Sequence, residues 1–169
     1  TLPVEGVTLA DIQALTEALL RSGAPIGALN ATRKHLSQVK GGQLARLAYP
    51  ATTIALIVSD VVGSPLDVIA SGPTVADPTT AADARAALER FGVWEQAPES
   101  IRRHLEAVIA GDAPETPKPG DPAFERVQNV IVADNALAAE AARERAEALG
   151  FHATIATTFL EGEAREVAV

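Results

Sequence analysis

A basic segment that ends in a glycine pair is the first feature of this sequence that could do chemistry. The chain is acidic overall, with 22 Asp and Glu residues against 14 Lys and Arg and a net charge of −8, yet residues 18–59 contain no acid. Within "NATRKHLSQVKGGQLAR", residues 30–46, the predicted anion ligands are Arg33, Lys34, Lys40, Gly41 and Gly42. Glycine lets the backbone approach a bound anion closely. The pattern therefore predicts an anion site, and the alternative is a solvated basic surface.

Small polar residues and carboxylates follow the apolar runs that the sequence predicts as strands. Ligands of open α/β sheets bind beyond the carboxyl ends of the strands. The residues expected at these ends are Ser59, Asp60, Asp134, Asn135, Thr157 and Thr158. Asp60 is the strongest single candidate because it directly follows a mostly aliphatic run, although a simple turn cap would also explain it.

Two further segments could add ligands to the same crevice. "ASGPTVADP", residues 70–78, combines Ser71, Gly72 and Thr74 around a Gly-Pro break, and such a turn can present backbone N–H groups and hydroxyls to a phosphate or a carboxylate. "GEAREV", residues 162–167, carries Arg165 at the start of a predicted helix. A plain turn and an ion-paired helix face are the respective alternatives.

Several common nucleotide motifs are absent from the sequence. No G-x-x-x-x-G-K-[ST] phosphate loop and no G-x-G-x-x-G dinucleotide fingerprint occurs, which argues against a nicotinamide cofactor. His35, His104 and His152 have no partners at metal-ligand spacing, so we expect structural roles for them. Zero cysteines exclude a disulfide scaffold and a thiolate metal site, and suit a reducing cytoplasm.

The elements that must position these residues alternate between strands and helices. Continuous apolar runs predict strands of the type buried on both faces at residues 52–59 and 129–134, and a last strand is predicted at residues 152–158. Periodicity and capping signals predict helices at residues 10–23, 25–35, 41–47, 78–92, 98–111, 135–150 and from 162 onward. This order predicts an α/β fold, specifically a Rossmann-like three-layer α/β/α sandwich with a mainly parallel sheet. The proline-rich residues 111–123 should form an exposed loop.

Length and composition describe a globular domain. A chain of 169 residues with 47% hydrophobic and 21% charged residues can form one domain with a sizeable core. No apolar run reaches the length of a membrane span, and a pI near 4.8 argues against nucleic-acid binding. The chain has no Met and stops within a predicted helix, so we expect it to be a piece of a longer protein.

Four blocks of the sequence stand in a characteristic order and spacing along essentially the whole chain: "ATRKHLSQVKGGQLA", "SDVVGSPLDVIASGPTVADPTT", "ETPKPGD" and "GEAREVA". Together they resemble the glycerate 2-kinase family, also called the MOFRL family, whose members are often labelled hydroxypyruvate reductases. The resemblance implies ATP-dependent, Mg²⁺-assisted phosphorylation of D-glycerate to 2-phosphoglycerate. It also implies that residues 1–169 are part of the larger N-terminal domain of a two-domain enzyme. The family's catalytic lysine loop and its small C-terminal domain have no counterpart here, and Ser64 stands where an acid is common.

The resemblance also suggests roles for the candidate residues. Arg33 and Lys40 would contact the glycerate carboxylate or a phosphate, and Lys34 and the glycines would add donors. Asp60 would hold Mg²⁺ or orient the 2-hydroxyl group, since hard oxygen ligands suit that ion. Ser71 and Thr74 would add hydroxyl contacts. The alternatives are a hydroxypyruvate reductase and a non-catalytic anion-binding module, and a homodimer is left open.

Overall fold

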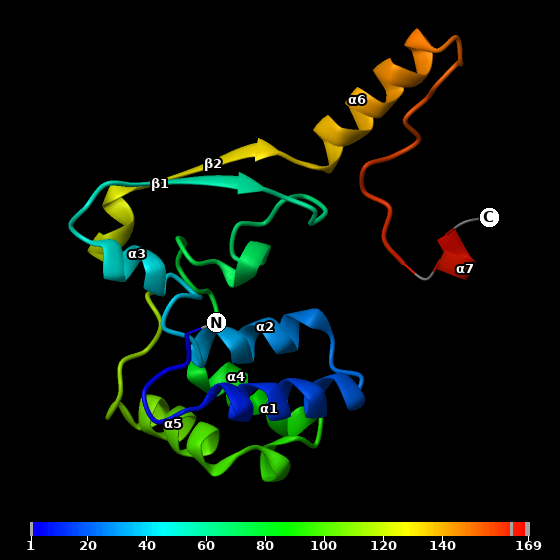
Figure 1. Cartoon of the computed structure of the whole chain (residues 1–169). Coiled ribbons are helices and arrows are strands. Elements are labelled where there is room, and N and C mark those ends of the chain that lie inside the picture. Colours follow the sequence, from blue (N-terminus) through cyan, green and yellow to red (C-terminus); the bar gives the residue numbers. More distant parts are fainter. Residues whose placement is uncertain (1, 163, 168–169) are drawn as a thin grey trace. The chain divides into compact units, whose positions relative to one another are not determined.

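A computed structural model of the chain describes residues 2–162 and 164–167. The chain divides into two compact units, each of which is described by itself. The first unit consists of residues 1–53 and 66–128, and the second of residues 54–65 and 129–169. Figure 1 shows the elements of both along the chain.

The first unit is built mainly from helices. Its α-helices are α1 (Leu9–Arg21), α2 (Ile26–His35), α3 (Gln43–Ala48), α4 (Ala81–Arg90) and α5 (Glu99–Ala110). Its short 3-10 helices are η1 (Ile69–Ser71), η2 (Trp94–Gln96) and η3 (Pro122–Arg126). These positions confirm the five helices predicted for this part of the sequence, with ends shifted by a few residues.

Two of these helices begin with reciprocal capping boxes. The side chain of Thr8 accepts the backbone N–H of Asp11 while the Asp11 carboxylate accepts the N–H of Thr8, and α1 starts directly afterwards. Thr80 and Asp83 form the same arrangement before α4. Each box satisfies backbone donors that a helix start leaves unpaired.

The core of the first unit lies among α1, α2, α4 and α5. α2 packs against α4, and α4 packs against α5. The buried side chains of this core include Leu15, Leu19, Leu29, Leu88, Trp94, Ile101 and Leu105. They recur at helical spacing along their elements, which is why one face of each helix is apolar.

The second unit contains the sheet. Strands β1 (Thr53–Val58) and β2 (Val127–Ala133) are neighbours and run in the same direction, and α6 (Asn135–Ala148) follows β2 directly. The short helix α7 (Ala164–Val167) lies near the end of the described chain. The α/β class is therefore confirmed at the level of a parallel two-stranded sheet with helices.

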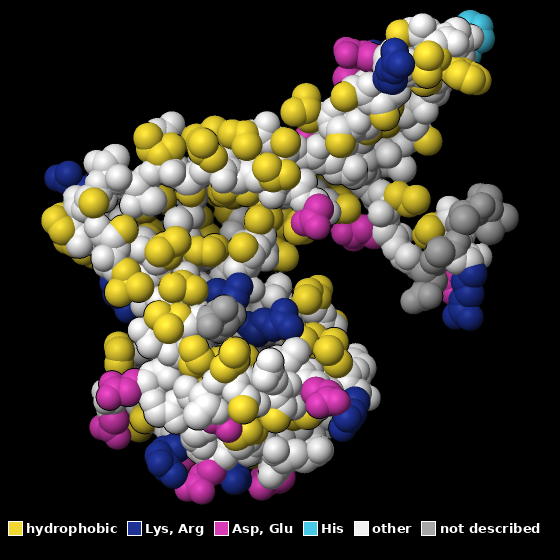
Figure 2. Space-filling model, viewed as in Figure 1, with side chains coloured by type: hydrophobic (Ala, Val, Ile, Leu, Met, Phe, Trp, Pro, Cys, Tyr) yellow, Lys and Arg dark blue, Asp and Glu magenta, His cyan; other side chains and the backbone are white. Residues whose placement is uncertain are grey.

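One face of β1 is open to solvent, which differs from the prediction of a strand buried on both faces. Ile54, Leu56 and Val58 are 62%, 71% and 71% exposed, and they alternate with partly buried neighbours. Figure 2 shows hydrophobic side chains over this sheet. The apolar run was correctly predicted as a strand, but within the described residues no layer covers these three side chains.

Two other predictions are wrong in part. Residues 152–158 form no strand, because among the described residues this segment pairs with neither β1 nor β2. The loop at residues 111–123 is irregular up to η3, as expected, but Thr116 and Pro117 in its middle are buried rather than exposed. Thr116 is drawn inside by hydrogen bonds to distant segments, described below.

Candidate functional site

Two tight turns of the first unit, residues 40–42 and 70–72, are hydrogen-bonded to each other, and we call them the paired turns. The backbone N–H of Gly41 donates to the carbonyl of Ser71 at 2.9 Å, and the N–H of Gly42 donates to the carbonyl of Gly72 at 2.7 Å. The sequence predicted these glycine N–H groups as donors to an anion. In the structure the opposite turn already accepts both, so the glycine pair serves to join the turns.

Gly42 shows why no other residue fits at this junction. Its φ of +81° lies in the left-handed region, and a Cβ added there would lie 2.8 Å from the carbonyl oxygen of Val75 and 2.8 Å from Cζ of Phe124. Real Cβ atoms essentially never come so close to a backbone oxygen. The close approach of the two turns therefore requires glycine at this position.

The second of the paired turns has an uncommon backbone. Ala70 and Ser71 both have positive φ, 52° and 61°, although neither is glycine, and Gly72 follows with 61°. Non-glycine residues in this region store strain, and such strain concentrates at ligand-binding and catalytic sites. Ser71 is buried, and its hydroxyl donates to Oδ1 of Asn30 on α2. Thr74 is buried two residues beyond the turn.

Two cations lie at the edge of the paired turns. The amino group of Lys40 donates to the carbonyl of Ala70 at 2.9 Å, which connects the two turns a third time. Partial burial lowers the pKa of Lys40, and the positive charge of Arg33, on the last turn of α2, lowers it further. Neither cation has a carboxylate within ion-pair distance among the residues that the structure describes. Figure 2 shows Lys and Arg side chains gathered beside α2 on this face.

Lys34 differs from these two cations because it points into the protein. Its side chain is only 4% exposed, and its amino group forms ion pairs with Asp77 at 3.2 Å and Asp67 at 3.6 Å. The amino group is thus already neutralised by carboxylates of the same unit. The predicted direct contact between Lys34 and an anion has no support in this arrangement.

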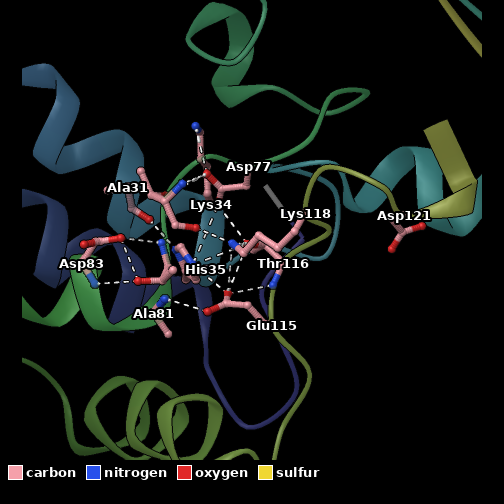
Figure 3. A network of polar contacts seen from close by, with 12 residues as sticks. Ala31, Lys34, His35, Asp77, Ala81, Asp83, Glu115, Thr116, Lys118 and Asp121 are labelled. Atoms are coloured by element: carbon pink, nitrogen blue, oxygen red, sulfur yellow. Dashed lines mark hydrogen bonds and ion pairs between the residues drawn. The ribbon is translucent and has the colours of Figure 1, made fainter.

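Lys34 belongs to a group of side chains that point toward one another between α2 and the 114–118 loop (Figure 3). We call this group the Asp77 cluster, and its members are Lys34, His35, Asp77, Glu115, Thr116 and Lys118. Lys118 donates from its amino group to the Thr116 hydroxyl at 2.7 Å and to the carbonyl of Thr79.

His35 is held from both sides of its ring. Nδ1 donates to the carbonyl of Ala31 at 2.8 Å, while Nε2 lies 2.9 Å from Oε1 of Glu115. Burial opposes ionisation of Glu115, but hydrogen bonds from His35 and from the N–H groups of Ala81 and Thr116 outweigh it and set the pKa of this carboxyl far below its usual 4.5. Because a carbonyl only accepts hydrogen bonds, Nδ1 of His35 is a donor in this geometry, and the ring is fixed between α2 and the 114–118 loop.

In the second unit the predicted polar residues at the strand ends come together. The N–H of Ser59, just after β1, donates to the carbonyl of Ala133 at the end of β2, so Asp60 and Asn135 follow neighbouring strand ends. Asn135 donates from its side-chain nitrogen to the carbonyl of Thr158 at 3.1 Å, which brings the third predicted segment to the same place although it is no strand. This agrees with the rule that ligand crevices form at the carboxyl ends of strands.

The predicted site residues of the second unit differ in how exposed their side chains are and in whether those side chains already have partners. Ser59 is buried, and its hydroxyl accepts hydrogen bonds from the N–H of Val61 and the hydroxyl of Ser64. Asp60 is exposed and has no hydrogen-bond or ion-pair partner among the described residues. The side chain of Arg165 on α7 is 81% exposed, with Glu166 3.9 Å away. Asp60 is therefore the free carboxylate of this group.

A preformed metal cage is not found in the described part of the chain. No three His, Asp or Glu side chains lie together there as a metal site. A single exposed carboxylate such as Asp60 still suits Mg²⁺, since this ion is commonly held by one or two carboxylates together with substrate phosphates and water.

A cavity of about 900 Å³ lies elsewhere in the first unit, between residues 3–7, α3, α5 and the 113–116 loop. Two of its basic lining side chains, Arg46 and His35, are already paired with Asp121 at 2.9 Å and with Glu115, and the lining residue Glu5 is itself an acid. None of the predicted site residues lines it. We therefore place the candidate anion site at Arg33 and Lys40, whose charges lack described counter-charges, and not in this cavity.

Sequence reasoning missed the residues that support this site. Asp77, Glu115 and Thr116 lie in segments that looked like an ordinary turn and a proline-rich loop. In the sequence they stand out only as members of the blocks "SDVVGSPLDVIASGPTVADPTT" and "ETPKPGD", which carry the family resemblance but indicate no individual role for them. Their importance comes from contacts with residues more than thirty positions away.

A family profile and individual known proteins both match this chain, and the two kinds of match agree on its family. A family profile described as "Domain of unknown function (DUF4147)" matches residues 1–106. A protein of Pyrococcus horikoshii named "Glycerate 2-kinase" is 49% identical over 165 residues, and one of Agrobacterium vitis named "Putative hydroxypyruvate reductase" is 48% identical over 165 residues. Each match covers 98% of this chain but only 37% and 35% of the relative.

The fold is also found among solved structures. A crystal structure of a Pyrococcus horikoshii protein superimposes with a TM-score of 0.80 at 49% identity, covering 98% of this chain and 37% of that one. The chain thus spans about a third of the length of the relatives that it matches.

Among the described residues, no helix combines the length and the apolar composition that a membrane-spanning segment needs.

Proposed function

The chain belongs to the DUF4147 family, and from this premise we propose that it forms part of a glycerate 2-kinase that phosphorylates D-glycerate with ATP. The observation that supports this proposal best is the pair of cations Arg33 and Lys40, which lie beside a strained turn without described counter-charges. Relatives named glycerate kinase at 42–49% identity support the same reaction.

In this reaction the 2-hydroxyl oxygen of glycerate attacks the γ-phosphorus of ATP. The bond from that phosphorus to the β,γ-bridging oxygen breaks, ADP leaves, and the hydroxyl proton passes to a base or to water. Such a transfer depends on positioning and on neutralising phosphate oxygens more than on covalent chemistry by the protein. Mg²⁺, when bound, would supply part of that neutralisation.

The proposal assigns a role to each candidate residue according to its surroundings. Arg33 and Lys40 bind the anionic group of glycerate or of the nucleotide. Asp60 contributes a free carboxylate for Mg²⁺ or for orienting the 2-hydroxyl group. The remaining binding residues of the proposal are Ser59, Asn135, Arg165 and Thr74. Lys34, Gly41, Gly42, Ser71 and Gly72 act indirectly, by building the paired turns and their support.

The proposal also includes expectations about the fold, the domain and the location of the intact protein. We infer that the intact protein completes the three-layer sandwich around β1 and β2, that residues 1–169 belong to one larger domain, and that the protein works in the cytoplasm. The exposed apolar face of β1 supports the first of these inferences, because such a face is normally covered. A homodimer stays an open prediction.

One assay separates the proposed function from its rivals. The intact protein is supplied with D-glycerate and ATP, and 2-phosphoglycerate is measured; in parallel, NADH oxidation is measured with hydroxypyruvate. We expect only the first reaction. NADH oxidation alone would favour a reductase, which is the printed name of the Agrobacterium vitis relative, and neither reaction would favour a non-catalytic anion-binding module.

Two variants test the residue assignments. Arg33→Gln should raise the KM for an anionic substrate roughly 10- to 100-fold, the usual worth of a charged hydrogen bond. Arg103→Gln removes a 73% exposed cation from α5 and is the matched control. Asp60→Asn should reduce turnover and weaken the Mg²⁺ dependence, whereas Asp112→Asn, on an exposed turn, should not. Unchanged turnover and Mg²⁺ dependence in Asp60→Asn would remove this residue from the mechanism.

A further inference from the structure

Asp77 is a fully buried carboxylate, with a relative exposure of 0%. Its Oδ1 accepts the N–H and the hydroxyl of Thr79 at 3.0 and 2.8 Å and lies 3.2 Å from the amino group of Lys34. Its Oδ2 accepts the hydroxyl of Thr116 at 3.0 Å and lies 3.8 Å from Nε2 of His35. One carboxylate therefore connects α2, the 77–80 turn and the 114–118 loop.

The same carboxylate supports the first of the paired turns from behind. A Cβ at Gly41 would lie 3.3 Å from Oδ2 of Asp77 and 3.0 Å from Cβ of Lys34, so this turn rests directly on both side chains. Arg33 precedes Lys34 on α2, and Lys40 precedes Gly41. Each proposed anion ligand is thus the direct sequence neighbour of a residue that lies against Asp77: Arg33 is next to Lys34, and Lys40 is next to Gly41.

Stability alone does not account for this arrangement. Burial opposes ionisation of Asp77, but the hydrogen bonds from Thr79 and the charges of Lys34 and His35 outweigh it and hold the pKa of Asp77 below its usual range. A buried ion pair often gains no more free energy than well-packed apolar side chains would, because both charges lose their hydration. Its directional contacts do fix the relative placement of the segments that carry them.

We propose that Asp77 is a positioning residue for the anion site: it holds α2 and the paired turns so that Arg33 and Lys40 are presented together. This inference rests on the proposed function. It predicts that loss of the Asp77 charge weakens substrate binding in protein that is still folded. A residue needed only for folding would instead lower the amount of active enzyme and leave the KM unchanged.

The test is Asp77→Asn in the intact protein, because asparagine keeps the size of the side chain and the acceptor for Thr79 but removes the charge opposite Lys34. We expect the KM for D-glycerate or for ATP to rise at least about 10-fold, with a smaller change in kcat, as for a lost charged contact. Calorimetric titration with D-glycerate or ATP should show the same loss of affinity. An unchanged KM and an unchanged affinity for both substrates would overturn the inference.

Asp121→Asn is the matched control. Asp121 is a carboxylate of the same unit whose side chain pairs with Arg46 and forms no described bond with the paired turns or with the side chains of the Asp77 cluster. Its one described bond to the cluster runs from its backbone N–H to the carbonyl of Lys118, which the substitution leaves in place. Its KM values should equal those of the wild type. If Asp77→Asn does not fold, Thr116→Val replaces it, since this change keeps the Asp77 charge and removes one of its hydrogen bonds, together with the contacts of the Thr116 hydroxyl with Lys118 and Glu115. A KM several-fold higher in Thr116→Val supports the inference, and an unchanged KM overturns it.

The two proposals fail in different ways. Wild-type protein that phosphorylates glycerate, with an Asp77→Asn variant of equal KM, would overturn the positioning role and leave the kinase assignment intact. Wild-type protein that neither binds nor phosphorylates D-glycerate would overturn the kinase assignment, and the positioning role with it.

Discussion

The glycine at position 42 gives the most direct test of the structure, through the substitution Gly42→Ala. The residue has a φ of +81°, where an L side chain costs about 1–2 kcal/mol. The added Cβ would also lie 2.8 Å from the backbone oxygen of Val75, which cannot rotate away as the ring of Phe124 could. Overpacking of this kind costs about 1–3 kcal/mol. The sum predicts a loss of unfolding free energy of about 2–5 kcal/mol.

Urea unfolding of the 169-residue chain measures this loss. Trp94 is the one tryptophan of the sequence and is buried in the core of the first unit, so its fluorescence reports on that unit. Gly92→Ala is the matched control, because Gly92 has a φ of +66° but nothing within 4 Å of an added Cβ. It should lose only the conformational part, about 1–2 kcal/mol. Equal losses in the two variants would refute the claim that close approach of the paired turns requires glycine.

Three further outcomes follow from the same structure. The pKa of Glu115 is lowered in the folded protein, so the stability that this carboxylate contributes is complete above its usual pKa of 4.5 and is lost as the pH falls below that value. The free energy of unfolding should therefore fall less steeply between pH 5 and pH 3 in Glu115→Gln than in the wild type. Urea titrations at each pH would measure this difference. Leu88→Ala removes a fully buried side chain and should cost about 2–5 kcal/mol, whereas Leu20→Ala, 62% exposed on α1 of the same unit, should cost less than about 0.5 kcal/mol in the same assay. Thr80→Ala breaks the capping box of α4 and should cost about 1 kcal/mol, and a change smaller than the error of the measurement would contradict the capping role.

Local signals predicted the helices of the first unit well. The Thr8–Asp11 and Thr80–Asp83 pairs mark the starts of α1 and α4 because a capping box involves residues only three positions apart. Gly111 ends α5 in the left-handed conformation for an equally local reason. Such features depend on the nearby sequence, so the sequence contains the information needed to find them.

The site was less predictable because its contacts are not local. The basic segment predicted Arg33 and Lys40 as anion ligands, which stays a prediction, and nothing near Gly41 in the sequence indicates that its N–H donates to Ser71, thirty residues away. The same is true of Lys34, because its ion pairs with the distant Asp67 and Asp77 are what distinguish it from its neighbour Arg33. For residues 152–158 the β-branched composition was real, but composition does not specify a pairing strand.

The open face of β1 has a consequence for work with the isolated chain. Ile54, Leu56 and Val58 form an exposed apolar strip on a sheet of two strands, and among the described residues no third strand pairs with either outer edge of that sheet. Such strips recruit extended segments of other molecules. We therefore expect the second unit to limit the solubility of the purified chain, and a lysine in place of Leu56 to delay precipitation without disturbing the helical unit.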